Sequence, residues 1–355
     1  MSQAIVCVCH NRQQFQNIDS VLPYLRAYMQ CSEIVFIDLG EATGWSPPTC
    51  REMKYKIIKM DIGNRNFHFS STLRKITTLF SFRLKRRQNV PFLDGKKIIG
   101  IFGVYGPLEK TISRALGIRK EESFLIQDSI YFAQPSKGVK GVIKNLILYS
   151  SKHRFEQLAK IFVSGEYTKR KFIGEGVDER KIIDFGIPRF QSLKNLDTLP
   201  RCEISHLVFL CGAWAWHGHD KMQKVEYYLI HELEKKCKDE KIAFYAKPHP
   251  RGESVPIPRA DFSELKPNNT LVVSFCSTLM FELAAEGWGV AYIAPPDCYR
   301  KLTQNFDKYL FELDVRVGLR EQFNKVANCS GIEHFITFNG AAAKDIAKTI
   351  VKHVD

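Results

Sequence analysis

The stretch "NTLVVSFCSTLMFELAAEGWGVAYIAPP" occupies residues 269–296 and contains a complete strand–helix–strand pattern. An apolar run ends at Ser274, Ser277 and Thr278 open a helical segment, and a second apolar run, GVAYI, follows. Two strands joined through a helix in this way lie parallel in one sheet. The segment therefore predicts an α/β protein with helices packed on a parallel sheet.

The same alternation extends outward from this segment in both directions. The runs HLVFLCG (206–212) and KIAFYAKPHP (241–250) predict strands on either side of a helix at 220–240. Another series of alternating strands and helices fills the N-terminal half, beginning with AIVCVC (4–9). We therefore expect two doubly wound, Rossmann-like domains facing a cleft, with these boundaries: an N-terminal domain at 1–190, a linker at 191–205, a second domain at 206–338 and a C-terminal helix at 339–355.

Composition and charge limit the class of protein. The chain has 355 residues and a net charge of +14, which favours anionic partners. Its ten cysteines lack metal-ligand spacing, and the start has no secretion-signal pattern, so we expect a cytoplasmic protein without metal or disulfides. No nucleic-acid-binding motif accompanies the charge. Lys85, Arg86, Arg87 and the region 137–160 instead suggest peripheral contact with an anionic membrane.

The motif KPHPR (247–251) follows an apolar strand and places His249 between two prolines. Proline restricts itself and the residue before it, so Lys247, His249 and Arg251 lie on a stiff, extended loop at the strand's carboxyl end. Ser277 and Thr278 begin a helix after another strand, where free N–H groups and the helix dipole favour a phosphate. The two motifs together predict a site for a leaving phosphate.

Two further loops follow the first strand of each predicted domain. Gly212 and Trp214 lie in CGAWAWHGHDK (211–221), where an aromatic residue at a cleft could stack on a sugar or base. In the N-terminal domain the corresponding loop carries His10, Asn11 and Arg12, which we expect to contact an acceptor.

The motif pair KPHPR and S-x-x-ST-x-x-x-E-x-x-x-x-G-x-x-V, with Ser274 as its first residue, resembles the C-terminal half of GT-B glycosyltransferases. It is most similar to bacterial sialyltransferases and polysialyltransferases, and shares its layout with Kdo transferases and CDP-glycerol glycerophosphotransferases. The resemblance is good over residues 158–296, and in the N-terminal half it is limited to the alternation of predicted strands and helices.

This resemblance implies an inverting transferase that moves a nonulosonic acid, of sialic acid or Kdo type, from a CMP-sugar to an anionic bacterial surface glycan. His249 would assist the departure of CMP, and Ser277 and Thr278 would bind its phosphate, without a metal or other cofactor. The general base would be Asp128 in LIQDSIY, although its neighbours depart from the family's acidic motif; Asp38 in FIDLG is the second candidate.

Two alternatives remain open from the sequence. A teichoic-type CDP-glycerol or ribitol phosphotransferase would use a similar C-terminal half but attack phosphorus. A non-catalytic module that binds anionic glycans or membrane surfaces would need only the basic charge. The nucleotide that the protein binds distinguishes these possibilities from the CMP-sugar transferase.

Overall fold

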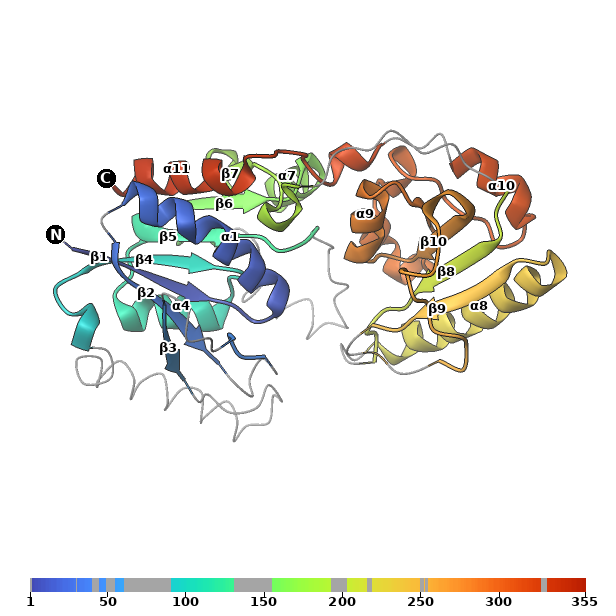
Figure 1. Cartoon of the computed structure of the whole chain (residues 1–355), viewed down its shortest axis with the longest axis horizontal. Coiled ribbons are helices and arrows are strands. Elements are labelled where there is room, and N and C mark those ends of the chain that lie inside the picture. Colours follow the sequence, from blue (N-terminus) through green and yellow to red (C-terminus); the bar gives the residue numbers. More distant parts are fainter. Residues whose placement is uncertain are drawn as a thin grey trace. The chain divides into compact units, whose positions relative to one another are not determined.

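The computed structural model describes residues 2–29, 31–39, 45–48, 55–60, 91–130, 155–192, 203–215, 219–249, 252, 255–326 and 331–355. The chain forms two compact units (Figure 1). Unit 1 comprises residues 1–130, 136–192 and 339–355, and unit 2 comprises 131–135 and 193–338. The C-terminal segment thus returns to the unit in which the chain begins.

Unit 1 is built on a seven-stranded parallel sheet with the order β3-β2-β1-β4-β5-β6-β7. The chain moves from β1 to β2 on one side and later starts again at β4 on the other side of β1. The carboxyl ends of β1 and β4 therefore flank a topological switch point, where such sheets bind ligands. The strands are β1 (Gln3–Val8), β2 (Cys31–Asp38), β3 (Lys56–Lys59), β4 (Lys97–Phe102), β5 (Ser123–Ile126), β6 (Lys160–Val163) and β7 (Ile182–Asp184).

The helices of unit 1 are α1 (Arg12–Tyr28), α4 (Pro107–Leu116), α7 (Glu166–Gly174) and α11 (Ala342–Val354). Asn11 caps α1 by accepting a bond from the Gln14 amide at 2.8 Å. The α11 helix buries Ala343, Ile346 and Ile350 at helical spacing in the core cluster that α1 also joins. Figure 1 shows these two helices side by side over the sheet, so the C-terminal helix completes the core of unit 1.

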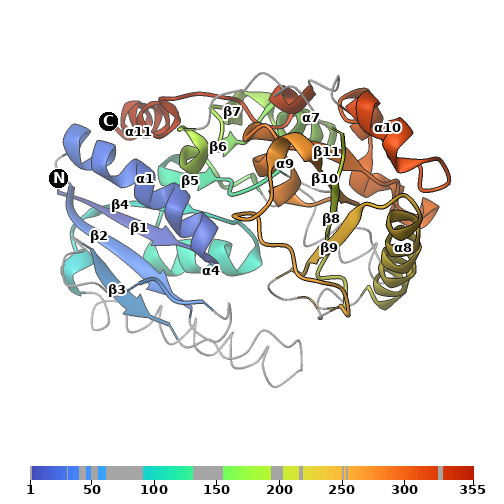
Figure 2. The ribbon, with the colours of Figure 1, turned by 45° about the vertical axis from the view of Figure 1, so that its right-hand side comes forward.

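Unit 2 contains a four-stranded parallel sheet with the order β11-β10-β8-β9. Its strands are β8 (His206–Leu210), β9 (Ala243–Lys247), β10 (Thr270–Ser274) and β11 (Gly289–Tyr292), and its helices are α8 (Asp220–Asp239), α9 (Thr278–Ala285) and α10 (Leu319–Val326). In Figures 1 and 2, α8 and α9 lie on opposite sides of this sheet. The chain leaves β8 for β9 on one side and returns to β10 on the other, which makes the carboxyl ends of β8 and β10 a second switch point.

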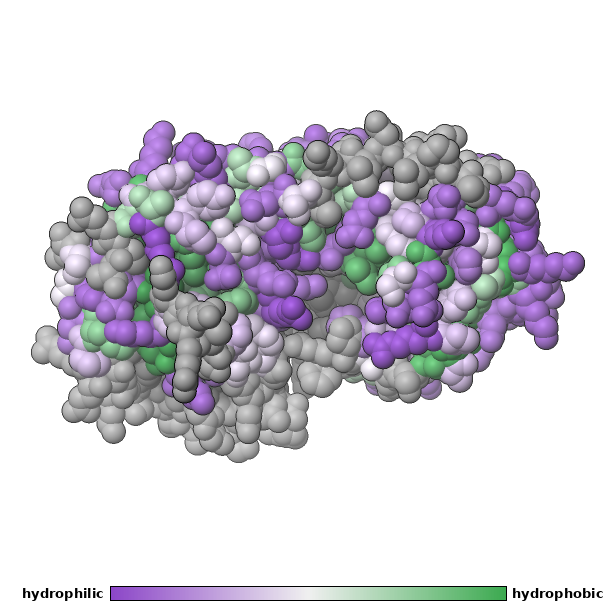
Figure 3. Space-filling model, viewed as in Figure 1, coloured by the Kyte–Doolittle hydropathy of each residue, from purple (hydrophilic) through white to green (hydrophobic). Residues whose placement is uncertain are grey.

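The apolar runs recognised in the sequence become the buried strands of both sheets. Residues 271–273 of β10 and 207–209 of β8 are fully buried, as expected for strands covered on both faces. The visible surface is largely hydrophilic, with apolar side chains between the polar ones (Figure 3). The predicted fold class, two doubly wound α/β units, is confirmed. Among the described residues, no helix is long and apolar enough to cross a membrane.

Candidate active site

The phosphate-site residues predicted in unit 2 lie at the carboxyl ends of β9 and β10, with β8 between these strands. Neighbouring strands are about 4.8 Å apart, so the loops after β9 and β10 are separated by roughly 10 Å. The loop after β8 fills the middle: a Cβ atom on Gly252 would lie 3.0 Å from the Gly212 carbonyl and 3.3 Å from the His249 Cβ. The structure thus gathers these segments at one edge of the sheet.

His249 follows the end of β9 by two residues and is exposed. Its carbonyl accepts a hydrogen bond from the Gly252 amide at 2.8 Å, so the chain turns back immediately after it. Lys247 is the last residue of β9, and its ammonium lies 5.8 Å from the ring centroid of Phe262. Arg251 falls outside the described residues. The stiff loop expected from the prolines therefore ends in a turn that presents the imidazole at the sheet edge.

Ser277 occupies the N-cap position of α9, yet its hydroxyl makes no capping bond. Thr278 is the first helical residue, and both side chains are half-buried. The sequence suggested that such residues either cap the helix or bind phosphate; the structure shows no capping bond from Ser277, and the phosphate role stays a prediction. Ser274 differs from its predicted role: it is buried, and its hydroxyl donates to the Leu210 carbonyl at 3.1 Å, which ties β10 to β8.

Trp214 also differs from its predicted stacking role. Its side chain lies in the core cluster of unit 2, only 9% exposed, with an edge-on contact to Phe275. The indole Nε1–H donates to Glu226 Oε2 at 2.6 Å, and the Gly212 amide donates to the same oxygen at 2.9 Å. Trp214 therefore holds the loop in place and offers no free ring face for a sugar.

Glu226 in α8 is the residue that sequence analysis missed in this unit. It is 1% exposed and receives both loop N–H groups, although it lies 14 residues from Gly212. Burial raises the pKa of this carboxyl to about 7, against the lowering effect of the Gly212 and Trp214 hydrogen bonds. Burial and the nearby Glu226 carboxylate also raise the pKa of the thiols of Cys211 and Cys276 to about 12. The two thiols therefore stay protonated, and neither is a nucleophile at neutral pH.

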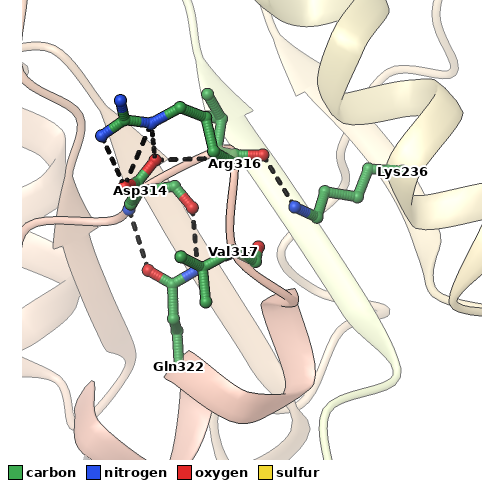
Figure 4. A network of polar contacts seen from close by, with 6 residues as sticks. Lys236, Asp314, Arg316, Val317 and Gln322 are labelled. Atoms are coloured by element: carbon green, nitrogen blue, oxygen red, sulfur yellow. Dashed lines mark hydrogen bonds and ion pairs between the residues drawn. The ribbon is translucent and has the colours of Figure 1, made fainter.

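A cavity of about 570 Å³ opens elsewhere in unit 2, between α8 and the chain after β11. Its wall at residues 312–316 is fixed by a polar network (Figure 4). In that network Gln322 accepts from the Asp314 amide at 2.8 Å, and Lys236 donates to the Val315 carbonyl at 2.7 Å. None of the predicted donor-site residues lines this cavity, but Phe275, which follows Ser274 at the end of β10, does.

In unit 1, Asp128 lies just beyond the end of β5, as the sequence predicted, and is half-buried. Its Oδ2 accepts hydrogen bonds from the side-chain amides of Asn11 and Gln14, each at 3.2 Å, and the Arg189 guanidinium donates to its carbonyl at 3.2 Å. The structure thus joins Asp128 to the predicted acceptor loop after β1. Gln14 and Arg189 were not identified from the sequence, because neither belongs to a recognisable motif.

His10 and Glu109 form a close pair at the same edge. The His10 Nε2 atom lies 2.7 Å from Glu109 Oε1, and the Gly106 amide donates to Glu109 Oε2 at 2.7 Å. Arg12, the third residue of the predicted acceptor loop, is exposed. Asp38 is buried at the end of β2 and accepts from the Ser46 hydroxyl at 2.8 Å, so its Oδ1 atom is already bonded. Within the described part of the chain, no group of three or more His, Cys, Asp and Glu side chains could hold a metal ion.

Comparison with solved structures identifies the fold as GT-B. The UDP-GlcNAc 2-epimerase of Methanocaldococcus jannaschii, solved with UDP-GlcNAc and UDP, superposes with a TM-score of 0.56 at 12% identity, over 99% of this chain and 100% of that one. The glycotransferase of kitacinnamycin gives 0.56 at 10% identity, over 100% of both chains. The wall teichoic acid polymerase TagF with CDPG gives 0.52 at 11% identity, over 99% of this chain and 88% of that one.

At these identities the likeness concerns the fold alone. Neither a protein-family model nor a curated protein matches the sequence. The comparisons therefore establish the fold, and the chemistry has to be argued from the residues at the edge of each sheet.

Proposed function

We propose that this protein is an inverting, metal-independent glycosyltransferase that moves a nonulosonic acid from a CMP-sugar to a bacterial surface glycan. One observation in unit 2 carries the proposal. His249, which is exposed, and Ser277, the N-cap residue whose hydroxyl makes no capping bond, lie at the same edge of the sheet. A departing CMP phosphate needs hydrogen-bond donors placed where its charge develops. His249, Ser277, Thr278 and the free N–H groups of α9 supply them in this proposal.

The acceptor would bind at the edge of unit 1. Asp128, Asn11, Gln14 and His10 form a connected polar cluster there, at the switch point of the larger sheet. Arg12 is exposed beside this cluster and suits an acceptor carboxylate. The reaction also requires a general base in this cluster, because the acceptor hydroxyl must lose its proton while the new bond forms.

The donor class is tested by isothermal titration and transfer assays with four compounds: CMP-sialic acid, CMP-Kdo, CDP-glycerol and UDP-GlcNAc. We expect binding and transfer with one of the CMP-sugars only. Productive transfer from CDP-glycerol would establish the teichoic-type alternative instead, and binding of no nucleotide would support the non-catalytic one. Conversion of UDP-GlcNAc to its epimer would also refute the proposal.

Substitutions then test the assigned site. His249→Ala should lower kcat on the order of 10²-fold while leaving the fold intact, because it removes a donor to the leaving group. Ser277→Ala combined with Thr278→Ala should weaken CMP binding about tenfold or more, since two hydroxyl contacts to an anion are lost. His206→Ala is a matched control, because His206 lies in β8 at the amino end of the strand, away from this edge. A folded His249→Ala variant with wild-type turnover would remove the imidazole from the mechanism.

A further inference from the structure

The loop after β8 lies in the middle of the proposed phosphate site, because β8 separates β9 from β10 in the sheet. On one side, the Cys211 amide donates to the Lys247 carbonyl at 3.0 Å, which joins the loop to the end of β9. On the other side, the Ser274 hydroxyl donates to the Leu210 carbonyl at 3.1 Å, which joins β8 to the end of β10. The loop is therefore placed to support both halves of the site, the turn at His249 and the start of α9.

Gly212 brings this loop against the turn at His249. A Cβ atom on Gly252 would lie 3.0 Å from the Gly212 carbonyl oxygen and 3.3 Å from the His249 Cβ, so the three residues are packed closely together. The Gly252 amide donates to the His249 carbonyl at 2.8 Å, which makes Gly252 part of the same turn. The backbone of Gly212 therefore limits where the turn, and with it the imidazole, can lie.

Trp214 connects the same loop to the start of α9. Its indole ring makes an edge-on contact with Phe275, with the ring centroids 6.3 Å apart. Phe275 is buried and precedes Ser277 by two residues, so it lies in the short segment between β10 and α9. Buried aromatic rings in edge-on contact hold each other in place by packing. The indole ring therefore supports the segment that leads to Ser277 and Thr278.

Glu226 in α8 holds the two loop residues that make these contacts. Its Oε2 accepts the Trp214 indole N–H at 2.6 Å and the Gly212 amide at 2.9 Å, and its Oε1 accepts the same amide at 3.2 Å. The Glu226 side chain is buried, and it belongs to a helix that packs Met222 and Leu229 into the core cluster of unit 2. One carboxyl, fixed by the core, thus anchors both contacts.

From these contacts we infer that Glu226 is a positioning residue of the donor site. Through Gly212 it sets the geometry of the turn at His249, and through Trp214 it sets the geometry of the α9 start. The inference rests on the proposed phosphate site and specifies what holds that site in place. Such sites tolerate displacements of only about 0.5 Å. A carboxyl accepts hydrogen bonds whether or not it is ionised, so the role depends on its oxygens and not on its charge.

Four variants separate this role from a general contribution to stability. Glu226→Leu removes both hydrogen bonds, and Glu226→Gln keeps an oxygen that can accept them. Trp214→Phe removes the indole donor and leaves the bond to the Gly212 amide. Glu240→Leu is the matched control: Glu240 is the C-cap residue of α8, and its carboxylate accepts the first two backbone amides of α10 at 2.9 and 3.0 Å. It lies at the end of α8 that leads into β9, away from the phosphate site.

The first experiment measures amide hydrogen exchange of the full chain by mass spectrometry and needs no substrate. Glu226→Leu should speed exchange about tenfold or more in peptides covering 247–252 and 275–280, because local opening becomes more frequent, whereas Glu226→Gln and Glu240→Leu should not. Trp214→Phe should speed exchange in 275–280 only, which keeps the test valid if Glu226→Leu fails to fold. Faster exchange confined to 211–219 in either Glu226→Leu or Trp214→Phe would overturn the inference.

The second experiment measures the Kd for CMP and the kcat with the substrates that the wild type accepts. Glu226→Leu should weaken binding and lower kcat, each by about tenfold or more, since misplacement by 1 Å can cost on the order of 10²-fold in rate. Glu226→Gln should restore both values, and Glu240→Leu should leave both unchanged even if it lowers the melting temperature. Wild-type binding and turnover in a folded Glu226→Leu would overturn the inference. Absence of CMP binding in the wild type would instead count against the proposed function, while the exchange measurement would still test the role of Glu226.

Discussion

The buried carboxyl of Glu226 should make the stability of unit 2 depend on pH. Its pKa rises from the ordinary value of 4.5 to about 7, because burial takes the side chain out of water and outweighs the hydrogen bonds from Gly212 and Trp214. The folded state therefore holds this proton more tightly than the unfolded state, and folding is favoured at low pH. As pH rises through 4.5 the unfolded chain begins to release the proton, while the folded chain keeps it until about pH 7.

The size of the effect follows from the same values. Each pH unit between the two pKa values corresponds to about 1.4 kcal/mol, so ionised Glu226 costs about 3 kcal/mol of unfolding free energy well above pH 7. Between about pH 5 and pH 8 the wild type should lose roughly 2 to 3 kcal/mol through this group. Glu226→Gln keeps an oxygen for the Trp214 and Gly212 donors but cannot ionise, so its stability should change less over this range.

Urea unfolding followed by the fluorescence of the tryptophans measures both proteins at each pH. The informative quantity is a double difference in the free energy of unfolding. It is the change between low and high pH for the wild type minus the same change for Glu226→Gln, so the contributions of all other titrating groups cancel. Glu312→Gln is a suitable control, since Glu312 accepts from the Tyr292 hydroxyl in the same unit and its substitution leaves Glu226 intact. A double difference below about 0.5 kcal/mol would refute the argument that burial dominates the ionisation of Glu226.

Three further predictions concern the loop after β8, the start of α9 and the basic surface. Gly212→Ala should destabilise the protein by about 1–3 kcal/mol in urea unfolding, because its Cβ would lie 2.3 Å from the Trp214 Nε1 atom; Gly174→Ala, with open space around its Cβ, should not. Ser277→Ala should change stability by less than about 0.5 kcal/mol, below the usual loss for an N-cap, because its hydroxyl makes no capping bond. The basic run 85–87 lies outside the described residues. Its predicted contact with anionic membranes should make the protein float with anionic vesicles at low salt, and this flotation should be lost by about 0.5 M salt. Equal flotation with neutral vesicles would contradict this prediction.

The strand ends of both sheets were predictable from the sequence, because apolar runs bounded by Gly, Pro or polar residues carry their own signal. The sequence therefore predicts Asp128, His249 and Ser277 at strand or helix ends. The roles of Trp214 and Ser274 were not predictable from the same pattern. An aromatic residue in a loop and a serine at a strand end look the same in sequence whether they face a ligand or the core.

The partners of the site residues were also beyond the reach of the sequence. Glu109 is an ordinary acidic residue in the first turn of a helix, a position where such residues are common for reasons of capping alone. Its contact with His10 joins positions that are about a hundred residues apart in the printed sequence, and it exists because β1 and β4 are neighbours in the sheet. Sheet order is a property of the whole fold, so contacts that depend on it appear only in three dimensions.

One structural device occurs in both units and connects these observations. In unit 1, Glu109 accepts the amide of Gly106 and lies beside the ring nitrogen of His10; in unit 2, Glu226 accepts the amide of Gly212 and the ring N–H of Trp214. In each case a buried carboxylate from a helix joins a glycine in the loop after a strand to a nitrogen-containing ring at the same sheet edge. A buried carboxylate is costly unless it is hydrogen-bonded, so the bonds to the Gly106 and Gly212 amides favour one conformation of each loop. The rings differ in kind: the Trp214 indole has one N–H and donates it to Glu226, whereas the His10 imidazole has two nitrogens.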